Sequence, residues 1–123
     1  MKDESGIKWF SEPEEHDYIA AGSYLLLIYD QEATSKLVDK LKAEKTTVFK
    51  AKDIFRASQL SLLGVSNSHV EKDKLKIAKG KKLSPILLVR DPVNDKVIIA
   101  DGYHRLCAIY TVDEDALIPC KIV

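Results

Sequence analysis

Residues of the kinds that bind anions stand together in the stretch IIADGYHRLCAIY, residues 98–110. An apolar run ends at Asp101 and Gly102. His104 and Arg105 then open a pattern of apolar residues with helical spacing. A helix that begins here presents unpaired N–H groups and the positive end of its dipole. A glycine lets an anion approach the backbone, and a guanidinium offers a planar set of donors that suits phosphate. The stretch predicts a phosphate site at a helix N-terminus.

Simpler interpretations of the same residues stay open, because a tight turn with solvated charges needs the same residue types. Asp101 could act as a base or a metal ligand, and it could equally cap the helix. His104 titrates near neutral pH and is a second catalytic candidate. Asp53 and Glu71 are further acid or base candidates. The sequence contains no GxxxxGK[ST] loop, so a nucleotide site here would not be of the P-loop type.

The segment upstream supplies candidates for the opposite wall of the site. Arg56 could reach the phosphates or lie on the surface as an ordinary solvated arginine. Asn67 and His69 stand in a polar stretch that opens a helix. His69 and His104 both fall at predicted helix N-termini; a shared ligand would explain this placement, and so would coincidence.

Length and charge favour one ordinary domain. The 123 residues suggest a single domain over 1–123, with a loose tail over about 1–10 and a helical region over about 12–43. The 19 basic and 19 acidic residues balance, so net charge points neither to nucleic acid nor to a membrane. Lysines concentrate in residues 72–82, which is either a polyanion-binding side or a solvated helix face.

The two cysteines and the N-terminus bear on metal binding and location. Cys107 and Cys120 lack the spacing of a zinc site, so no metal site is predicted. The first residues are charged and contain no apolar segment of the signal-peptide kind. The longest apolar run is too short to span a bilayer. We therefore expect free thiols, a cytoplasmic location and no membrane partner.

Periodicity and turn residues place the elements that must position these side chains. A helix over 12–28 is capped by Ser11, although residues 24–29 could instead form a buried strand. The remaining predicted elements are a helix from Asp30, a strand over 46–54, a helical turn and loop over 55–67, a helix from Ser68 to Gly80, antiparallel strands over 84–90 and 96–100, a helix from Tyr103, and a final strand within 116–123. This order predicts an α/β (α+β) fold with a small mixed sheet flanked by helices.

The segments SPILLVR, VIIADGYHRLCA and IPCKIV together resemble the ParB/sulfiredoxin superfamily, loosely over 46–123 and well over 84–123. DGYHR is most similar to the DGHHR-type signature of the free-serine kinases of this fold. It also resembles the GGCHR signature of sulfiredoxins and the GERRxRA box of ParB. In these families the segment grips nucleotide phosphates. The resemblance therefore implies that the phosphate ligands include Gly102, Tyr103, His104 and Arg105, and that the ligand is ATP, ADP or CTP with Mg²⁺.

Departures from these signatures narrow what the resemblance implies. Tyr103 stands where sulfiredoxins have their reactive cysteine, so reduction of cysteine sulfinic acid is not expected. Tyr103 and His104 also replace a glutamate and an arginine of the ParB box, which weakens the case for CTP. The chain ends at Val123, before the helix-turn-helix that follows in ParB. We therefore expect no sequence-specific DNA binding from this chain.

Two functional hypotheses follow. The first is a ParB-like domain that binds a nucleotide or another phosphate compound, with phosphotransferase or nucleotidase activity on ATP or ADP. The second is a non-catalytic ParB-like module that docks on a partner protein or a polyanion. A nuclease ranks last, because the sequence has no clustered carboxylates to hold two metal ions. The residues leave open whether the chain forms a homo-oligomer.

Overall fold

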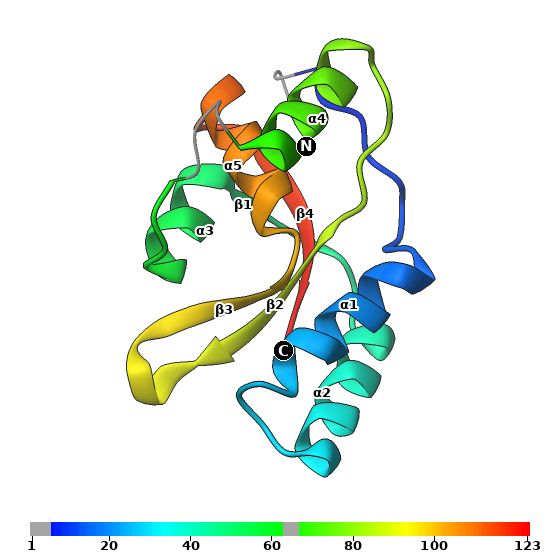
Figure 1. Cartoon of the computed structure of the whole chain (residues 1–123), viewed down its shortest axis with the longest axis vertical. Helices are drawn as coiled ribbons and strands as arrows, with labels where there is room; N and C mark the ends of the chain where they lie inside the picture. Colours follow the sequence, from blue (N-terminus) through cyan, green and yellow to red (C-terminus); the bar gives the residue numbers. More distant parts are fainter. Residues whose placement is uncertain (1–5, 63–66) are drawn as a thin grey trace.

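The computed structural model describes residues 6–62 and 67–123, which form one four-stranded mixed sheet with helices on both faces (Figure 1). The helices are α1 Glu15–Leu25, α2 Gln31–Ala43, α3 Ala51–Ser58, α4 Ser68–Ala78 and α5 Tyr103–Val112. The strands are β1 Thr47–Lys50, β2 Ile86–Asp91, β3 Lys96–Asp101 and β4 Leu117–Ile122, with a 3-10 turn, η1, at Pro92–Asn94. This architecture confirms the predicted mixed α/β class.

The last strand lies inside the sheet, because the strand order is β1-β4-β2-β3. β2 and β3 form the predicted antiparallel hairpin around η1. β4 pairs parallel with β2 and antiparallel with β1. The segment before α1 also packs onto the domain, since Trp9 forms a bridge with Leu83 and contacts the core.

Alternation along the central strands explains why both faces of the sheet are covered by helices. Leu87 and Val89 of β2 pack with α1 and α2, whereas Ile86 and Leu88 pack with α3 and α5. A strand buried on both faces has an almost continuous apolar sequence, as SPILLVR does. Each fully buried side chain of this size contributes about 1.5–3 kcal/mol to stability.

A β-bulge near the end of β3 sets the direction of Asp101. Leu88 pairs with Ile99, but Leu87 pairs with Asp101, so Ala100 is an extra residue in β3. Successive residues of a regular strand point to opposite faces, and a bulge interrupts this alternation. Ala100 packs in the α1 cluster, and Asp101 is also directed toward α1.

The first helix differs from the prediction at both ends. α1 begins at Glu15, because Glu14 and Asp17 exchange the two hydrogen bonds of a capping box, and Ser11 does not cap it. The helix ends at Leu25 rather than at residue 28, and the following four residues form a turn. The alternative strand over residues 24–29 is therefore wrong. Asp30 caps α2 as predicted, accepting a hydrogen bond from the backbone of Ala33.

The predicted strand over 46–54 is correct only in its first half. β1 covers Thr47–Lys50, and the chain then turns directly into α3. The amides of Ala51 and Lys52 donate to the carbonyls of Ala116 and Glu114, which redirects the backbone. Ala51, Ile54 and Ser58 are the buried residues of α3, at helical spacing.

The helix α4 begins at Ser68, but its cap is Asn67 and not the predicted Ser68. The Asn67 side chain accepts hydrogen bonds from the amides of His69 and Val70, at 3.0 and 3.2 Å. Gly80 adopts a positive φ of 70° just after the helix, as its predicted role in ending the helix requires. Part of the loop predicted over 55–67, residues 63–66, lies outside the described residues.

Within residues 6–62 and 67–123, every helix falls short of the length and apolar character that crossing a bilayer requires. Cys107 and Cys120 are both buried. Burial raises the pKa of the Cys120 thiol to about 12. Neither cysteine therefore sits where a reactive thiolate is expected.

Candidate anion-binding site

The seam between β3 and α5, residues 101–105, borders a polar cavity of about 210 Å³. We call this the cationic cavity; it is lined by His69, Lys72, Asp73, Lys76, Asp101, Gly102, Tyr103, His104 and Arg105. The α4 residues follow i, i+3, i+4 and i+7 spacing and so share one helix face. The cavity therefore lies between that face of α4 and the N-terminus of α5.

His69 and His104 meet in this cavity, as the prediction of a shared ligand requires. Their ring centroids are 4.9 Å apart, with an angle of 46° between the planes. Val70 of α4 packs against Cys107 and Ala108 of α5, which holds the two helices together. Burial lowers the pKa of His104, the neighbouring His69 and Arg105 lower it further, and Asp73 raises it. His104 is therefore neutral in the free protein near pH 7.

Most N–H donors of the Arg105 guanidinium form hydrogen bonds inside the protein. Its Nε donates to the Ser84 carbonyl at 3.1 Å, and its Nη2 donates to the Pro85 carbonyl at 3.3 Å and to Asp101 Oδ2 at 3.2 Å. Its side chain is only 17% exposed. The guanidinium thus connects the residues just before β2 to the seam. It contributes a positive charge to the cavity wall, but most of its N–H donors are not available to a ligand.

A buried carboxyl pair lies behind Arg105. Asp17 of α1 is 2% exposed, and its Oδ1 lies 4.0 Å from Arg105 Nη2. Burial raises the pKa of Asp101 to about 6, Arg105 acts in the opposite direction, and a hydrogen bond shared with Asp17 raises it again. Asp101 does not cap α5, because Gly102 occupies the cap position without a side-chain bond. The sequence-based role of Asp101 as a helix cap is therefore wrong.

Gly102 and Tyr103 shape the seam. Gly102 has a φ of 112°, and its α-carbon faces Ile86 so closely that an added Cβ would lie 2.8 Å from Ile86 Cγ1. The Tyr103 hydroxyl donates to the Ser61 carbonyl, which ties the segment after α3 to the site. Tyr103 also lines a second cavity beside the cationic cavity.

The second cavity has a volume of about 430 Å³ and lies on the α1 side of the seam. We call it the apolar cavity, because its walls are mostly hydrophobic; it is lined by Ala20, Tyr24, Leu60, Ile99, Ala100, Asp101, Gly102, Tyr103 and His104. The seam residues from Asp101 to His104 thus border both cavities. A ligand with an anionic end and an uncharged end could therefore place the first in the cationic cavity and the second in the apolar cavity.

Two sequence-predicted residues have other roles. Arg56 is 86% exposed on α3, pairs with Asp53 at 3.5 Å, and lines neither cavity. The structure therefore does not bring Arg56 to the site. Asn67 caps α4 and thereby orients His69, but its side-chain oxygen is already engaged.

The prediction missed three α4 residues and one α1 residue. The helical spacing from His69 through Lys72, Asp73 and Lys76 was present in the sequence and would have placed them on one face. No local pattern marks Asp17, because its partners Asp101 and Arg105 lie more than eighty residues away.

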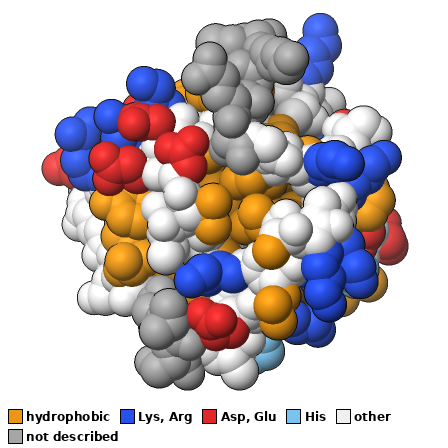
Figure 2. Space-filling model, turned by 90° about the horizontal axis from the view of Figure 1, so that it is seen from above, with side chains coloured by type: hydrophobic (Ala, Val, Ile, Leu, Met, Phe, Trp, Pro, Cys, Tyr) orange, Lys and Arg blue, Asp and Glu red, His pale blue; other side chains and the backbone are white. Residues whose placement is uncertain are grey.

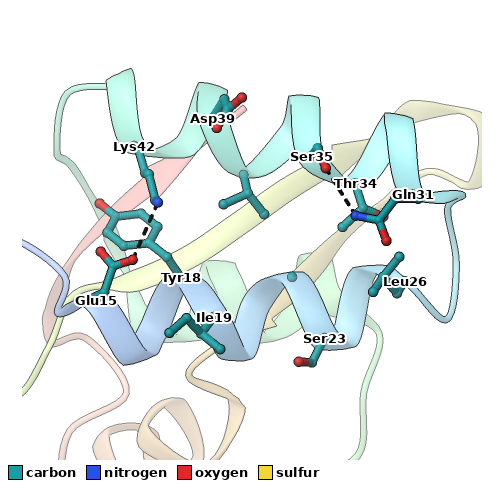
Figure 3. Close-up of a pocket in the computed structure, with 12 residues that line it drawn as sticks. Glu15, Tyr18, Ile19, Ser23, Leu26, Gln31, Thr34, Ser35, Asp39 and Lys42 are labelled. Carbon is teal, nitrogen blue, oxygen red and sulfur yellow. Dashed lines mark hydrogen bonds and ion pairs between the residues drawn. The ribbon is translucent and has the colours of Figure 1, made fainter.

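Two further features of the described residues lie outside the seam. A groove of about 340 Å³ runs between α1 and α2, with Glu15 paired to Lys42 at one end and Gln31 bonded to Ser35 at the other (Figure 3). Glu14, His16 and Asp17 stand close enough together to share a metal ion. His16 is 73% exposed, and its Nε2 lies 3.1 Å from Glu14 Oε2 and 3.5 Å from Asp17 Oδ1.

The cationic cavity itself offers two carboxylates to a divalent ion, Asp73 and Asp101. Asp101 is already bound to Arg105, and Lys72 and Lys76 stand on the same walls. This arrangement fits an Mg²⁺ ion that arrives with a phosphate, and it does not form a separate all-protein cage.

Comparisons of the chain with protein-family models, with curated proteins and with solved structures found no match.

Proposed function

We propose that this protein binds a phosphorylated small molecule, a nucleotide such as ATP, ADP or CTP with Mg²⁺, at the seam between β3 and α5. The observation that carries the proposal is the cationic cavity, in which His69, Lys72 and Lys76 face the N-terminus of α5. The resemblance of DGYHR to the phosphate-gripping segment of the ParB/sulfiredoxin superfamily supports the same ligand class. The location that we propose with it is the cytoplasm, where reduced thiols such as the buried Cys120 are the rule.

The charges on the cavity wall favour an anion over a cation. Asp101 offsets the charge of Arg105. The two positive charges of Lys72 and Lys76 then exceed the one negative charge of Asp73 on the cavity wall. The first amides of α5 add donors and the positive end of a helix dipole. One unit charge at 4 Å from another contributes about 1 kcal/mol in water and about 4 kcal/mol near a protein surface. Phosphate oxygens therefore gain from both the lysines and the helix.

The apolar cavity supports an organic phosphate in preference to the inorganic ion. Typical small-molecule sites occupy roughly 300–1,000 Å³. The cationic cavity alone has about 210 Å³, and the apolar cavity beside it adds about 430 Å³. Tyr24 and Tyr103 present rings against which a nucleobase or another flat group could stack.

A phosphotransferase or nucleotidase activity is the narrower form of this proposal. Phosphoryl transfer depends on charge placed around the phosphate and on a base that positions the attacking oxygen. His104 suits the base, because it borders both cavities and its pKa is lowered. Asp101 is the second candidate, and its bond to Arg105 makes it the less available of the two. Mg²⁺ bound to Asp73 would neutralise charge on the phosphates.

Replacing Lys72 and Lys76 together with glutamine should weaken nucleotide binding at least about tenfold, since a hydrogen bond to a charged group is worth roughly 1.5–3 kcal/mol. Calorimetry with ATP, ADP, CTP and pyrophosphate, each with and without Mg²⁺, would measure the change. Lys36→Gln with Lys40→Gln on α2 is the matched control, because it also removes two charges, from exposed helix positions away from both cavities. If none of these compounds binds the wild-type protein, the proposal is wrong.

A second candidate function, docking on a polyanion, is favoured by the lysines of α4 and the turn after it. Lys72, Lys76, Lys79 and Lys81 line a shallow hollow together with Leu75. Figure 2 shows a group of basic side chains on the right side of this view and a second group, mixed with acidic ones, at the upper left. The same calorimetry separates the two candidates. Lys79→Gln with Lys81→Gln should weaken a salt-sensitive polyanion contact and leave nucleotide binding unchanged.

A further inference from the structure

We infer that ligand binding in the cationic cavity is coupled to proton uptake by the His69–His104 pair, so that the site holds an anion more tightly in acid than in base. The inference rests on the proposed anion site and adds a form of regulation to it. It is carried by the contact between the two rings, their shared cavity wall and the charges around them.

The two imidazoles occupy equivalent positions on facing helices. His69 and His104 are each the second residue of their helix, α4 and α5 respectively. At that position the helix dipole opposes a positive charge on the ring. The centroid distance of 4.9 Å also makes two charged rings repel each other. Without a ligand, the helix dipole and the neighbouring ring therefore both disfavour a positive charge on His104.

The surrounding charges act in both directions, and on balance they oppose a positive charge on His104. The titratable and charged groups that border the cavity are Lys72, Asp73 and Lys76 from α4, Tyr103 and Arg105 from α5, and Asp101 from β3; Tyr24 from α1 borders the apolar cavity that His104 also lines. Asp73 favours a charged His104, whereas His69 and Arg105 oppose it. Asp101 is bound to Arg105 and so adds little at the rings.

An anion in the cavity reverses this balance. Its negative charge lies beside both rings and favours their protonated, doubly donating form. Because the coupling is reciprocal, protonation of the rings must strengthen anion binding by the same factor. One coupled proton changes affinity by roughly tenfold per pH unit between the pKa of the ring in the free protein and its higher pKa in the complex.

Sulfate is the appropriate probe, because its charge stays constant between about pH 5 and 8, whereas a phosphate ester titrates near pH 6. Calorimetry of the wild-type protein should show sulfate affinity falling about tenfold or more from pH 5.5 to pH 8, at constant ionic strength. Buffers with different ionisation enthalpies would report the number of protons taken up on binding. His69→Gln with His104→Gln should give a nearly flat profile and no proton uptake.

The outcomes distinguish this inference from the proposed function. Sulfate or nucleotide binding that is independent of pH in the wild type would overturn proton coupling and leave the anion site intact. A slope that survives in the double glutamine variant would also overturn it, because Asp101, with its pKa of about 6, would then be the titrating group. Absence of sulfate, pyrophosphate and nucleotide binding at every pH would reject both ideas. Unfolding curves of the variants would confirm that they are folded.

Discussion

Replacing Arg105 with methionine should cost about 3–5 kcal/mol of stability at pH 7–8, which is the usual loss when one partner is removed from a buried ion pair. Methionine keeps the length of the side chain and removes its charge. Asp101 would lose a 3.2 Å bond, and Asp17 would remain almost fully buried beside it. The carbonyls of Ser84 and Pro85 would lose their donors as well. Urea unfolding followed by circular dichroism measures the change.

The loss should shrink as the pH falls. The pKa of Asp101 is raised to about 6, which is above the value of an exposed aspartate, so protonation stabilises the folded state relative to the unfolded one. This contribution is complete below about pH 4 and is lost as the pH rises through about 6. The variant is therefore most defective at pH 7 and above, where a buried negative charge has no partner.

Arg56→Met is the matched control for Arg105. Arg56 is 86% exposed and forms one ion pair with Asp53 on the same helix, so its removal should change stability by no more than about 0.5 kcal/mol. Adding Asp101→Asn to Arg105→Met should recover part of the loss, because it removes the unpaired charge. Equal stability losses in the Arg105 and Arg56 variants would show that the buried cluster is unimportant.

Because Arg105 is important for stability, its variants are poor probes of ligand binding. A variant of Arg105 that fails to bind a nucleotide would report damage to the seam as well as loss of a ligand contact. Lys72 and Lys76 hold no comparable position in the core and are cleaner probes of the anion.

Gly102→Ala should destabilise the protein by about 2–4 kcal/mol, from overpacking and from a backbone conformation that side chains disfavour. Gly102 has a φ of 112°, and an added Cβ would lie 2.8 Å from Ile86 Cγ1 and 3.0 Å from Arg105 Nη2. Ile86 is fully buried in the centre of the sheet and has little room to move. Thermal unfolding followed by circular dichroism measures the shift.

Gly22→Ala is the natural comparison, and it should have the opposite sign. Gly22 lies inside α1, and its added Cβ would meet only Val38 Cγ2, at an ordinary 3.6 Å. Alanine in a helix interior is favoured over glycine by roughly 0.5–1 kcal/mol. If both variants change stability equally, the close approach of Gly102 to Ile86 is not the controlling contact.

Local patterns predicted the parts of the fold that depend on neighbours in the chain. The hairpin of β2 and β3 follows from two apolar runs around DPVND, and α5 follows from a change of period at Tyr103. The boundary at Lys50 was missed, because TTVFKAKDI alternates well enough for a strand. Two hydrogen bonds to the segment before β4 decide that the chain turns there into α3, and no local pattern records them.

The candidate site likewise has features that local patterns predict and features that they do not. Sequence reasoning placed Asp101, Gly102, His104 and Arg105 at one turn and placed His69 at a helix start, because caps and periodicity are short-range signals. It also suggested an anion for that turn. The residue types and their local spacing were sufficient for these placements, whereas the anion remains a prediction.

Tertiary structure alone determined what each of these residues contacts. The bulge at Ala100 directs Asp101 toward Asp17, and this buried pair draws Arg105 into the core, away from the free role that its position suggested. Packing of α4 on α5 brings His69 to 4.9 Å from His104 and adds Lys72 and Lys76 to the wall. Charge neutralisation and burial depend on partners that are distant in the chain. A local pattern could therefore locate the candidate residues at one turn, but it could not predict which of their hydrogen-bond donors are available to a ligand.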